Sequence, residues 1–302
     1  MAGPWLHSLA LSSRPSRHRI VGHGRGPAAI FSNQDRISIP CSRLAATNSP
    51  NAVALVVTSP SSSKTAATDP TEVVAIDGPS GAGKSTVARL LAKHLGFAFL
   101  DTGAMYRAVT WHFLEEGCAP AECANEPDLG HARMQQVMAA TRLELRDGRL
   151  FVAGRDVTSH LRTREVESQV SAVSALPFVR AAMRDLQREV ARHGPVVAEG
   201  RDMGSVVFPN ARWKVYLDAA PSERARRRSQ DFERQGRTVS EADVLEEILV
   251  RDRLDSTRRD APLRQAADAI YVDSTGLTTE VVVAQLFSFV RGRSGTVAGV
   301  VR

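Results

Sequence analysis

From about residue 71 onward, short apolar runs alternate with longer stretches in which apolar residues recur at helical spacing. The short runs are predominantly apolar on both faces, which is typical of strands buried in a parallel sheet. We therefore predict strands at Val73–Ile76, Phe97–Leu100, Val196–Ala198, Trp213–Leu217 and Ala269–Val272.

Helical stretches fall between these strands, at about 84–95, 102–116, 178–192, 222–235, 240–257 and 278–291. This alternation predicts an α/β fold, a parallel five-stranded sheet flanked by helices. Ligands of such sheets bind at the carboxyl ends of the strands. Residues that directly follow a predicted strand are therefore the first candidates for a functional site.

One stretch departs from the alternation. Thr141–Arg146 and Arg149–Ala153 flank Asp147-Gly148, a dipeptide typical of hairpin turns. Helical runs precede the hairpin at about 128–140 and follow it at about 163–174. We interpret residues 128–175 as an insertion on the main sheet, which we expect to hold a second substrate.

Composition limits the classes of partner. The chain has 302 residues, of which 43% are hydrophobic, enough for one or two domains with a large core. Seven basic residues and one acidic residue lie within residues 1–68, and these account for the net charge of +6. The remainder is formally neutral, which disfavours a nucleic-acid partner. No apolar run approaches the ~18 residues of a membrane span, and the three cysteines suit a reducing compartment.

Residues 1–70 are rich in Ser, Arg, Ala and Pro, and we expect them to be disordered. Their composition fits an organellar transit peptide, but equally a dispensable extension or an artefactual start. The folded domain is expected over residues 71–292, followed by a flexible tail at 293–302. We expect a monomer in the cytoplasm, with a plastid or mitochondrion as the alternative if residues 1–68 are a transit peptide.

A glycine-rich segment between the first predicted strand and its helix matches the phosphate-binding pattern G-x-x-x-x-G-K-[ST]. Its glycines let backbone N–H groups point at a phosphate, and the helix adds the positive end of its dipole. Lys84 can bridge the β- and γ-phosphates, and the Ser85 hydroxyl can bind Mg²⁺ directly. The predicted ATP site comprises Gly78, Pro79, Ser80, Gly81, Ala82, Gly83, Lys84, Ser85 and Thr86.

This loop alone does not choose among GTPases, motors, helicases and small-molecule kinases. The Asn-Lys-x-Asp motif that reads guanine is missing from the sequence. A large remodelling ATPase usually needs a longer chain. Arginine clusters favour a kinase whose second substrate is a small anion.

Two of these clusters directly follow predicted strands. In the first, Thr102 is suited to cap a helix and Arg107 lies a little over one turn further on, although its position alone equally fits a surface arginine. In the second, Glu199 is placed to orient the water ligands of Mg²⁺. Arg201 suits a phosphate there, and Asp202 suits a base edge rich in hydrogen-bond donors.

Two further clusters lie near the end of the domain. Arginines on the helical run at 222–237, among them Arg224 and Arg228, predict a lid that closes over the transferring phosphoryl group and excludes water. Arg251, Asp255 and Arg258 are spaced to share one helix face. That stripe is either a surface ladder of ion pairs or one wall of a site for ribose and phosphate.

The motifs together resemble those of bacterial-type cytidylate kinases. The matching segments are IDGPSGAGKST at 76–86, DTGAMYR at 101–107, GRDMGSVVFP at 200–209 and RDRLDS at 251–256. The resemblance covers about residues 72–291 and implies a P-loop NTPase fold. It also implies an inserted acceptor-binding lobe at about 102–175 and a short arginine-rich lid at about 222–237. Its implied activity is transfer of the ATP γ-phosphoryl group to CMP or dCMP with Mg²⁺.

The resemblance also implies roles for single residues, in which Lys84, Arg201, Arg224 and Arg228 act on the transferring group. Residues matching the acceptor site are Thr102, Tyr106, Arg107, Ser171, Arg180, Arg201, Asp202, Arg251, Asp255 and Arg258. Among these, Ser171, Arg180 and Asp202 match positions that read cytosine. The alternatives are a kinase for UMP, AMP or a non-nucleotide acceptor such as shikimate, or a nucleotide-dependent RNA-binding protein.

Overall fold

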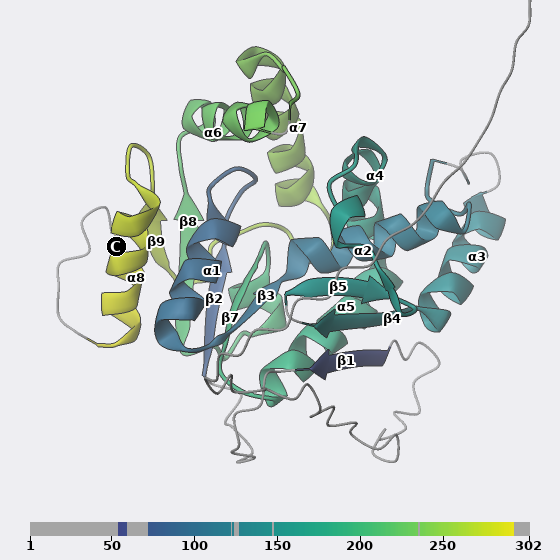
Figure 1. Ribbon diagram of the computed structural model, residues 1–302, viewed down its shortest axis with the longest axis horizontal. Helices are drawn as coiled ribbons and strands as arrows, with labels where there is room; N and C mark the ends of the chain where they lie inside the picture. The colour runs from purple at the N-terminus through teal and green to yellow at the C-terminus, as the bar shows by residue number, and fades with distance from the viewer. Residues whose placement is uncertain are drawn as a thin grey trace, which may run out of the picture. The chain divides into compact units, whose positions relative to one another are not determined.

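The computed structural model describes residues 54–58, 72–121, 123, 127–146, 148–234 and 236–292. Five strands, all paired in parallel, form the central sheet in the order β3-β7-β2-β8-β9 (Figure 1). Each predicted strand is confirmed to within two residues, and so is the α/β class. The strands are β2 (Val73–Asp77), β3 (Ala98–Asp101), β7 (Val196–Gly200), β8 (Trp213–Asp218) and β9 (Ile270–Asp273).

Successive residues of β2 point into two different cores, because side chains alternate across a strand. Val73 and Ala75 belong to the core that α2 and α5 cover, whereas Val74 and Ile76 belong to the core that α1 and α8 cover. This double burial explains why the strand lacks a polar face. The covering helices are α1 (Lys84–Leu95), α2 (Thr102–Glu115), α5 (Pro177–Arg192) and α8 (Thr279–Val290).

The inserted segment forms a lobe beside the central sheet (Figure 1). Its predicted hairpin is confirmed, since β4 and β5 pair antiparallel with Arg146 opposite Arg149. A short third strand, β6, and a helical turn, η2, follow the hairpin and were not predicted. The lobe elements are α3 (Pro127–Ala140), β4 (Arg142–Arg146), β5 (Arg149–Val152), β6 (Arg155–Asp156), η2 (Thr158–His160) and α4 (Arg164–Ala175).

A strand within the amino-terminal extension corrects the expectation of disorder there. Strand β1 (Ala54–Thr58) pairs in parallel with β4, and Ala54 lies opposite Arg142. The expectation is wrong for these five residues, whose β-branched run can extend the edge of the lobe sheet. The other expectations for residues 1–70, and those for 293–302, lie outside the described residues.

A turn that the apolar pattern did not predict ties the loop of β2 to the loop of β7. Both carboxylate oxygens of Asp77 accept main-chain N–H groups, from Met203 and Gly204, each at 2.7 Å. These residues begin the π-helical turn η3 (Met203–Val207). Burial raises the pKa of Asp77 to about 6, although both hydrogen bonds act to lower it. Asp77 thereby fixes the chain after β7 relative to the phosphate-binding loop.

The two helices of the lid region lie above the carboxyl ends of the strands in Figure 1. They are α6 (Pro221–Arg234) and α7 (Glu241–Thr257). Ala225, Phe232, Val244 and Ile248 form a small core of their own, so the pair packs as a unit. Across the part of the chain that the structure describes, none of the helices is long and apolar enough to cross a membrane.

Gly78 gives a first testable prediction about the fold. Its φ is +152°, and a Cβ added there would lie 1.9 Å from the main-chain oxygen of Leu217. Gly96 is the matched control, because its φ is +73° but no described heavy atom lies within 4 Å of an added Cβ. We expect Gly96→Ala to cost about 1–2 kcal/mol through backbone strain alone. Gly78→Ala should cost about 3 kcal/mol or more, because strand β8 must also move.

Urea unfolding of the nucleotide-free protein measures this difference. Equal losses of unfolding free energy in Gly78→Ala and Gly96→Ala would contradict the close approach between the loop and β8.

Candidate active site

A cavity of about 750 Å³ opens at the carboxyl ends of the central strands. Eleven Lys or Arg side chains and six Asp or Glu side chains line it, so it is suited to a polyanion. Residues 162–258 contribute most of the arginines, and the P-loop contributes the floor. The predicted residues on its wall are Ser80, Gly81, Ala82, Gly83, Lys84, Ser85, Thr86, Thr102, Tyr106, Arg107, Arg180, Glu199, Arg201, Asp202, Arg228, Arg251, Asp255 and Arg258.

Lys84 begins helix α1 and is held within the curl of the loop. Its ammonium group donates to the main-chain oxygen of Pro79 at 2.6 Å, and the residue is buried. Burial lowers the pKa of Lys84, the Arg201 guanidinium lowers it further, and the Glu199 carboxylate acts in the opposite direction. A triphosphate in the cavity would add negative charge and so favour the ammonium form.

Ser85 and Glu199 place two side-chain oxygens next to each other on the floor of the cavity. The Ser85 hydroxyl donates to Glu199 Oε1 at 2.7 Å. Glu199 is buried at the end of β7, and burial raises its pKa. A hydroxyl and a carboxylate are the kind of donors that Mg²⁺ prefers, so the residues present fit the metal expected with the P-loop. Among the described residues, no group of three or more His, Cys, Asp or Glu side chains could hold a metal ion.

Thr102 packs against the end of β7 instead of capping α2, so its expected role as the cap is wrong. Its hydroxyl donates to the main-chain oxygen of Glu199 at 2.7 Å. The cap is Asp101, whose carboxylate accepts the N–H of Ala104 at 2.8 Å. The start of α2, and with it Arg107, is therefore anchored to the strand that carries the proposed metal ligand.

Three residues that line the cavity, Arg201, Asp255 and Arg258, form one ion-pair cluster. Arg201 Nε donates to Asp255 Oδ2 at 2.8 Å, and Arg258 Nη1 lies 3.7 Å from the other oxygen of the same carboxylate. Burial and the two neighbouring guanidiniums Arg201 and Arg107 lower the pKa of Arg251 to about 10. Within the described structure, Arg251 Nε and Arg258 Nη2 are buried without a hydrogen-bond partner. These atoms can donate to a bound anion.

Arg180 and Asp202 form a buried ion pair at the far end of the cavity. The guanidinium of Arg180 also lies 5.9 Å from the centre of the Tyr106 ring. Burial raises the pKa of Tyr106 to about 12, so its hydroxyl stays protonated. Ser174 lines this end and its main-chain oxygen accepts from Arg180 at 3.3 Å, whereas Ser171, the predicted serine, does not line the cavity.

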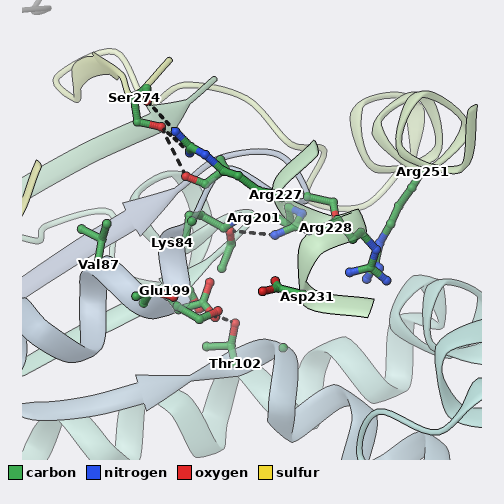
Figure 2. Close-up of a pocket in the computed structure, with 18 of the residues that line it drawn as sticks. Lys84, Val87, Thr102, Glu199, Arg201, Arg227, Arg228, Asp231, Arg251 and Ser274 are labelled. Carbon is green, nitrogen blue, oxygen red and sulfur yellow. Dashed lines mark hydrogen bonds between the residues drawn. The ribbon is translucent and has the colours of Figure 1, made fainter. Parts of the chain in front are cut away.

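Two arginines of α6 close the cavity from above. Figure 2 shows the side chain of Arg227 extending to Ser274, to which it donates at 3.0 Å (hydroxyl) and 2.6 Å (main chain). Arg228 approaches from the same helix, and Arg251 approaches from α7 (Figure 2). The loop after β9, which includes Ser274, therefore lines the cavity beside the phosphate-binding loop, although no sequence motif pointed to it.

The expectation that Arg224 is a lid arginine, like Arg228, is wrong. Arg224 is buried and does not line the cavity. Its guanidinium donates to the main-chain oxygens of Ala219 (2.9 Å) and Ser80 (3.1 Å) and pairs with Asp252. The Asp252 carboxylate also accepts the N–H of Ser80 at 3.4 Å. Arg224 thus stabilises the phosphate-binding loop without lining the cavity.

Comparison with known proteins decides the family. A family model described as cytidylate kinase matches residues 74–292. A protein named cytidylate kinase from Carboxydothermus hydrogenoformans is 47% identical over 228 residues, which cover 74% of this chain and 99% of that protein. The chain belongs to the cytidylate kinase family. Another member, from Mycobacterium leprae, is 47% identical over 226 residues, covering 74% of this chain and 98% of its own length.

The family also occurs as part of longer proteins. A bifunctional pantoate ligase/cytidylate kinase from Synechococcus elongatus is 46% identical over 230 residues, which cover 73% of this chain but 42% of that protein. Membership in the cytidylate kinase family makes this chain a phosphotransferase and accounts for the four matching motifs. Strand β1 precedes the matched residues.

One acidic residue that sequence reasoning missed lies among the arginines of this cytidylate kinase site. Glu167 of α4 pairs with Arg107, Arg228 and Arg251, which come from three different elements. Burial opposes its ionisation, but the three guanidiniums outweigh burial and lower the pKa of Glu167 to about 2. Glu167 belongs to no motif in the sequence, so nothing distinguished it from other charged residues on the helices of the inserted lobe.

Proposed function

We propose that this cytidylate kinase transfers the γ-phosphoryl group of ATP to the 5′-phosphate of CMP or dCMP within the cavity described above. One observation carries the proposal: the P-loop and arginines from six distant segments line the same cavity. Such an arrangement brings two phosphorylated substrates together in one place, which lowers the entropic cost of their reaction.

The donor would bind along the P-loop. The N–H groups of Gly81–Ser85 face the triphosphate, and the Lys84 ammonium bridges its β- and γ-phosphates. Ser85 directly, and Glu199 through water, would hold Mg²⁺, which when bound neutralises charge on the phosphates. The hydrogen bond between these two side chains keeps both oxygens on the cavity floor.

The acceptor would bind opposite, with its base toward Arg180 and Asp202 and its phosphate toward Arg107, Arg201 and Arg258. Arg251 and Asp255 would lie at the ribose. The buried carboxylate of Asp202 suits the amino group of cytosine, which uracil lacks. This difference is the proposed basis of selectivity.

Transfer needs neither a covalent intermediate nor a strong general base, because the acceptor phosphate is already an anion. Catalysis then consists of aligning the two phosphates and stabilising the charge that spreads over the transferred group. Arg201 and Arg228 supply guanidiniums for this charge, while α6 covers the cavity and excludes water as a competing acceptor.

A coupled assay with ATP, Mg²⁺ and a panel of acceptors tests this function. We expect CMP and dCMP to be phosphorylated with a kcat/KM at least about 100-fold above that for UMP, because a missing hydrogen bond in a buried site is costly. AMP has an amino group but a larger, purine base, and we expect it to be a poorer acceptor than CMP. Equal rates with UMP would contradict the role of Asp202. Phosphorylation of shikimate, but of none of the nucleotides, would show that the acceptor is not a nucleotide. A salt-sensitive RNA affinity of residues 71–302 would instead favour the RNA-binding alternative.

A further inference from the structure

The carboxylate of Glu167 lies within a ring of guanidiniums. Glu167 Oε1 accepts from Arg107 Nε at 2.7 Å, while Oε2 lies 3.3 Å from Arg228 Nη2 and 3.6 Å from Arg251 Nη1. The Glu167 side chain is 18% exposed. A single carboxylate thus joins α2, α4, α6 and α7 through three arginines that line the cavity.

The three partners matter because each belongs to the proposed acceptor or transfer machinery. Arg107 is proposed to hold the acceptor phosphate, Arg251 to lie at the ribose, and Arg228 to act on the transferred group. A carboxylate presents two anionic oxygens to guanidinium groups in much the same way as a phosphate does. Glu167 therefore offers these arginines the same kind of anionic partner that a substrate phosphate would offer.

Three other arginines of the proposed acceptor site pair with different carboxylates. Arg201 and Arg258 pair with Asp255, and Arg180 pairs with Asp202. Glu167 is the acidic partner that the structure gives to Arg107 and Arg228. A phosphate that binds these two arginines must share them with Glu167 or displace it.

We propose that Glu167 is an internal counter-anion that occupies the acceptor-phosphate position and must be displaced from Arg107 when the acceptor binds. This inference rests on the proposed function of the arginines. Its consequence is that Glu167 weakens acceptor binding, since part of the binding free energy is used to break its ion pairs. It also keeps the guanidiniums assembled between turnovers, when like charges would otherwise repel one another.

The test compares Glu167→Gln with a matched control. Glu165→Gln removes the same charge from the same helix at an exposed position. By isothermal titration, we expect CMP to bind Glu167→Gln about tenfold more tightly than the wild type, equivalent to about 1.4 kcal/mol. Inorganic phosphate should also bind more tightly as a competitor of CMP. Glu165→Gln should bind CMP as the wild type does.

A purely structural role for Glu167 gives the opposite result. If Glu167 only positions Arg107, then Glu167→Gln binds CMP less tightly, and that outcome overturns the proposal, as does an unchanged affinity. Glu167→Asp retains the charge with a shorter reach, so its affinity should lie between those of the wild type and Glu167→Gln.

Two further measurements separate this proposal from the assignment of the site. Arg107→Ala must weaken CMP binding if the acceptor site is correct, whatever Glu167 does. A crystal structure of the wild type with CMP should show the Glu167 carboxylate more than 4 Å from Arg107 Nε, a test that needs no variant to fold. A carboxylate still bonded to Arg107 in that complex would sink the counter-anion role while leaving the acceptor site intact.

Discussion

Replacing Lys84 with alanine should lower kcat by at least about 1,000-fold, the largest effect that we expect from a single side chain in this protein. The ammonium group is buried beside the loop that would hold the triphosphate, where solvent cannot replace its charge. Loss of this charge removes the only ammonium group that the phosphate-binding loop offers to the triphosphate as charge builds up in transfer.

Lys93→Ala is the matched control, because Lys93 lies on the same helix α1 and is exposed. A coupled assay with saturating ATP and CMP measures both variants, and thermal unfolding confirms that each is folded. Lys84 donates one hydrogen bond, to Pro79, so its removal should cost about 1 kcal/mol of stability. Near-normal turnover in a folded Lys84→Ala protein would refute the proposed donor site.

The framework of the site could be predicted from the sequence because its signals are local. Each central strand is a short apolar run, and the P-loop is a continuous motif between the first strand and its helix. Motif residues that directly follow strands, such as Glu199 and Arg201, lie together because parallel strands end at the same edge of the sheet. The order and direction of the strands are therefore enough to predict that these residues lie close together.

The remaining features depend on packing between segments far apart in the chain. Glu167 meets Arg251, 84 positions later, and nothing in the local pattern of α4 indicates that pairing. Arg224 lies on the arginine-rich run, yet it turns inward because the carbonyl of Ser80 and the carboxylate of Asp252 offer it buried acceptors. The sequence pattern does not distinguish this buried arginine from Arg228, which lies one helical turn later and lines the cavity.

Irregular backbone was missed for a related reason. The turn η3 is specified by Asp77, which lies 126 positions before Met203 in the sequence. Strand β1 was missed because its few apolar residues lie within a segment whose overall composition indicates disorder. In each case a single distant partner, not a periodic pattern, stabilises the local structure.

Replacing Arg201 with alanine is the second substitution with a large expected effect. Arg201 would contact the acceptor phosphate and the transferred group, and we expect kcat to fall about 1,000-fold, as for other guanidiniums that stabilise phosphoryl transfer. A loss of charge on Lys84 cannot explain this fall in kcat. The Arg201 guanidinium lowers the pKa of Lys84, so removing Arg201 favours the charged ammonium form of Lys84. Asp255 keeps Arg258 as a partner at 3.7 Å, so the fold should tolerate the change.

Matched variants make the interpretation of Arg201 specific. Arg201→Lys keeps the charge but not the planar fork of donors, so its kcat should fall by only about 10- to 100-fold. Arg192→Ala removes an exposed arginine at the end of α5, and it should leave kcat unchanged. Steady-state kinetics across these variants, with CMP and ATP varied in turn, measures each loss. If Arg201→Ala and Arg192→Ala had the same kcat, Arg201 would have no part in the transfer step, and Lys84 and the lid arginine Arg228 would have to balance the charge of the transition state.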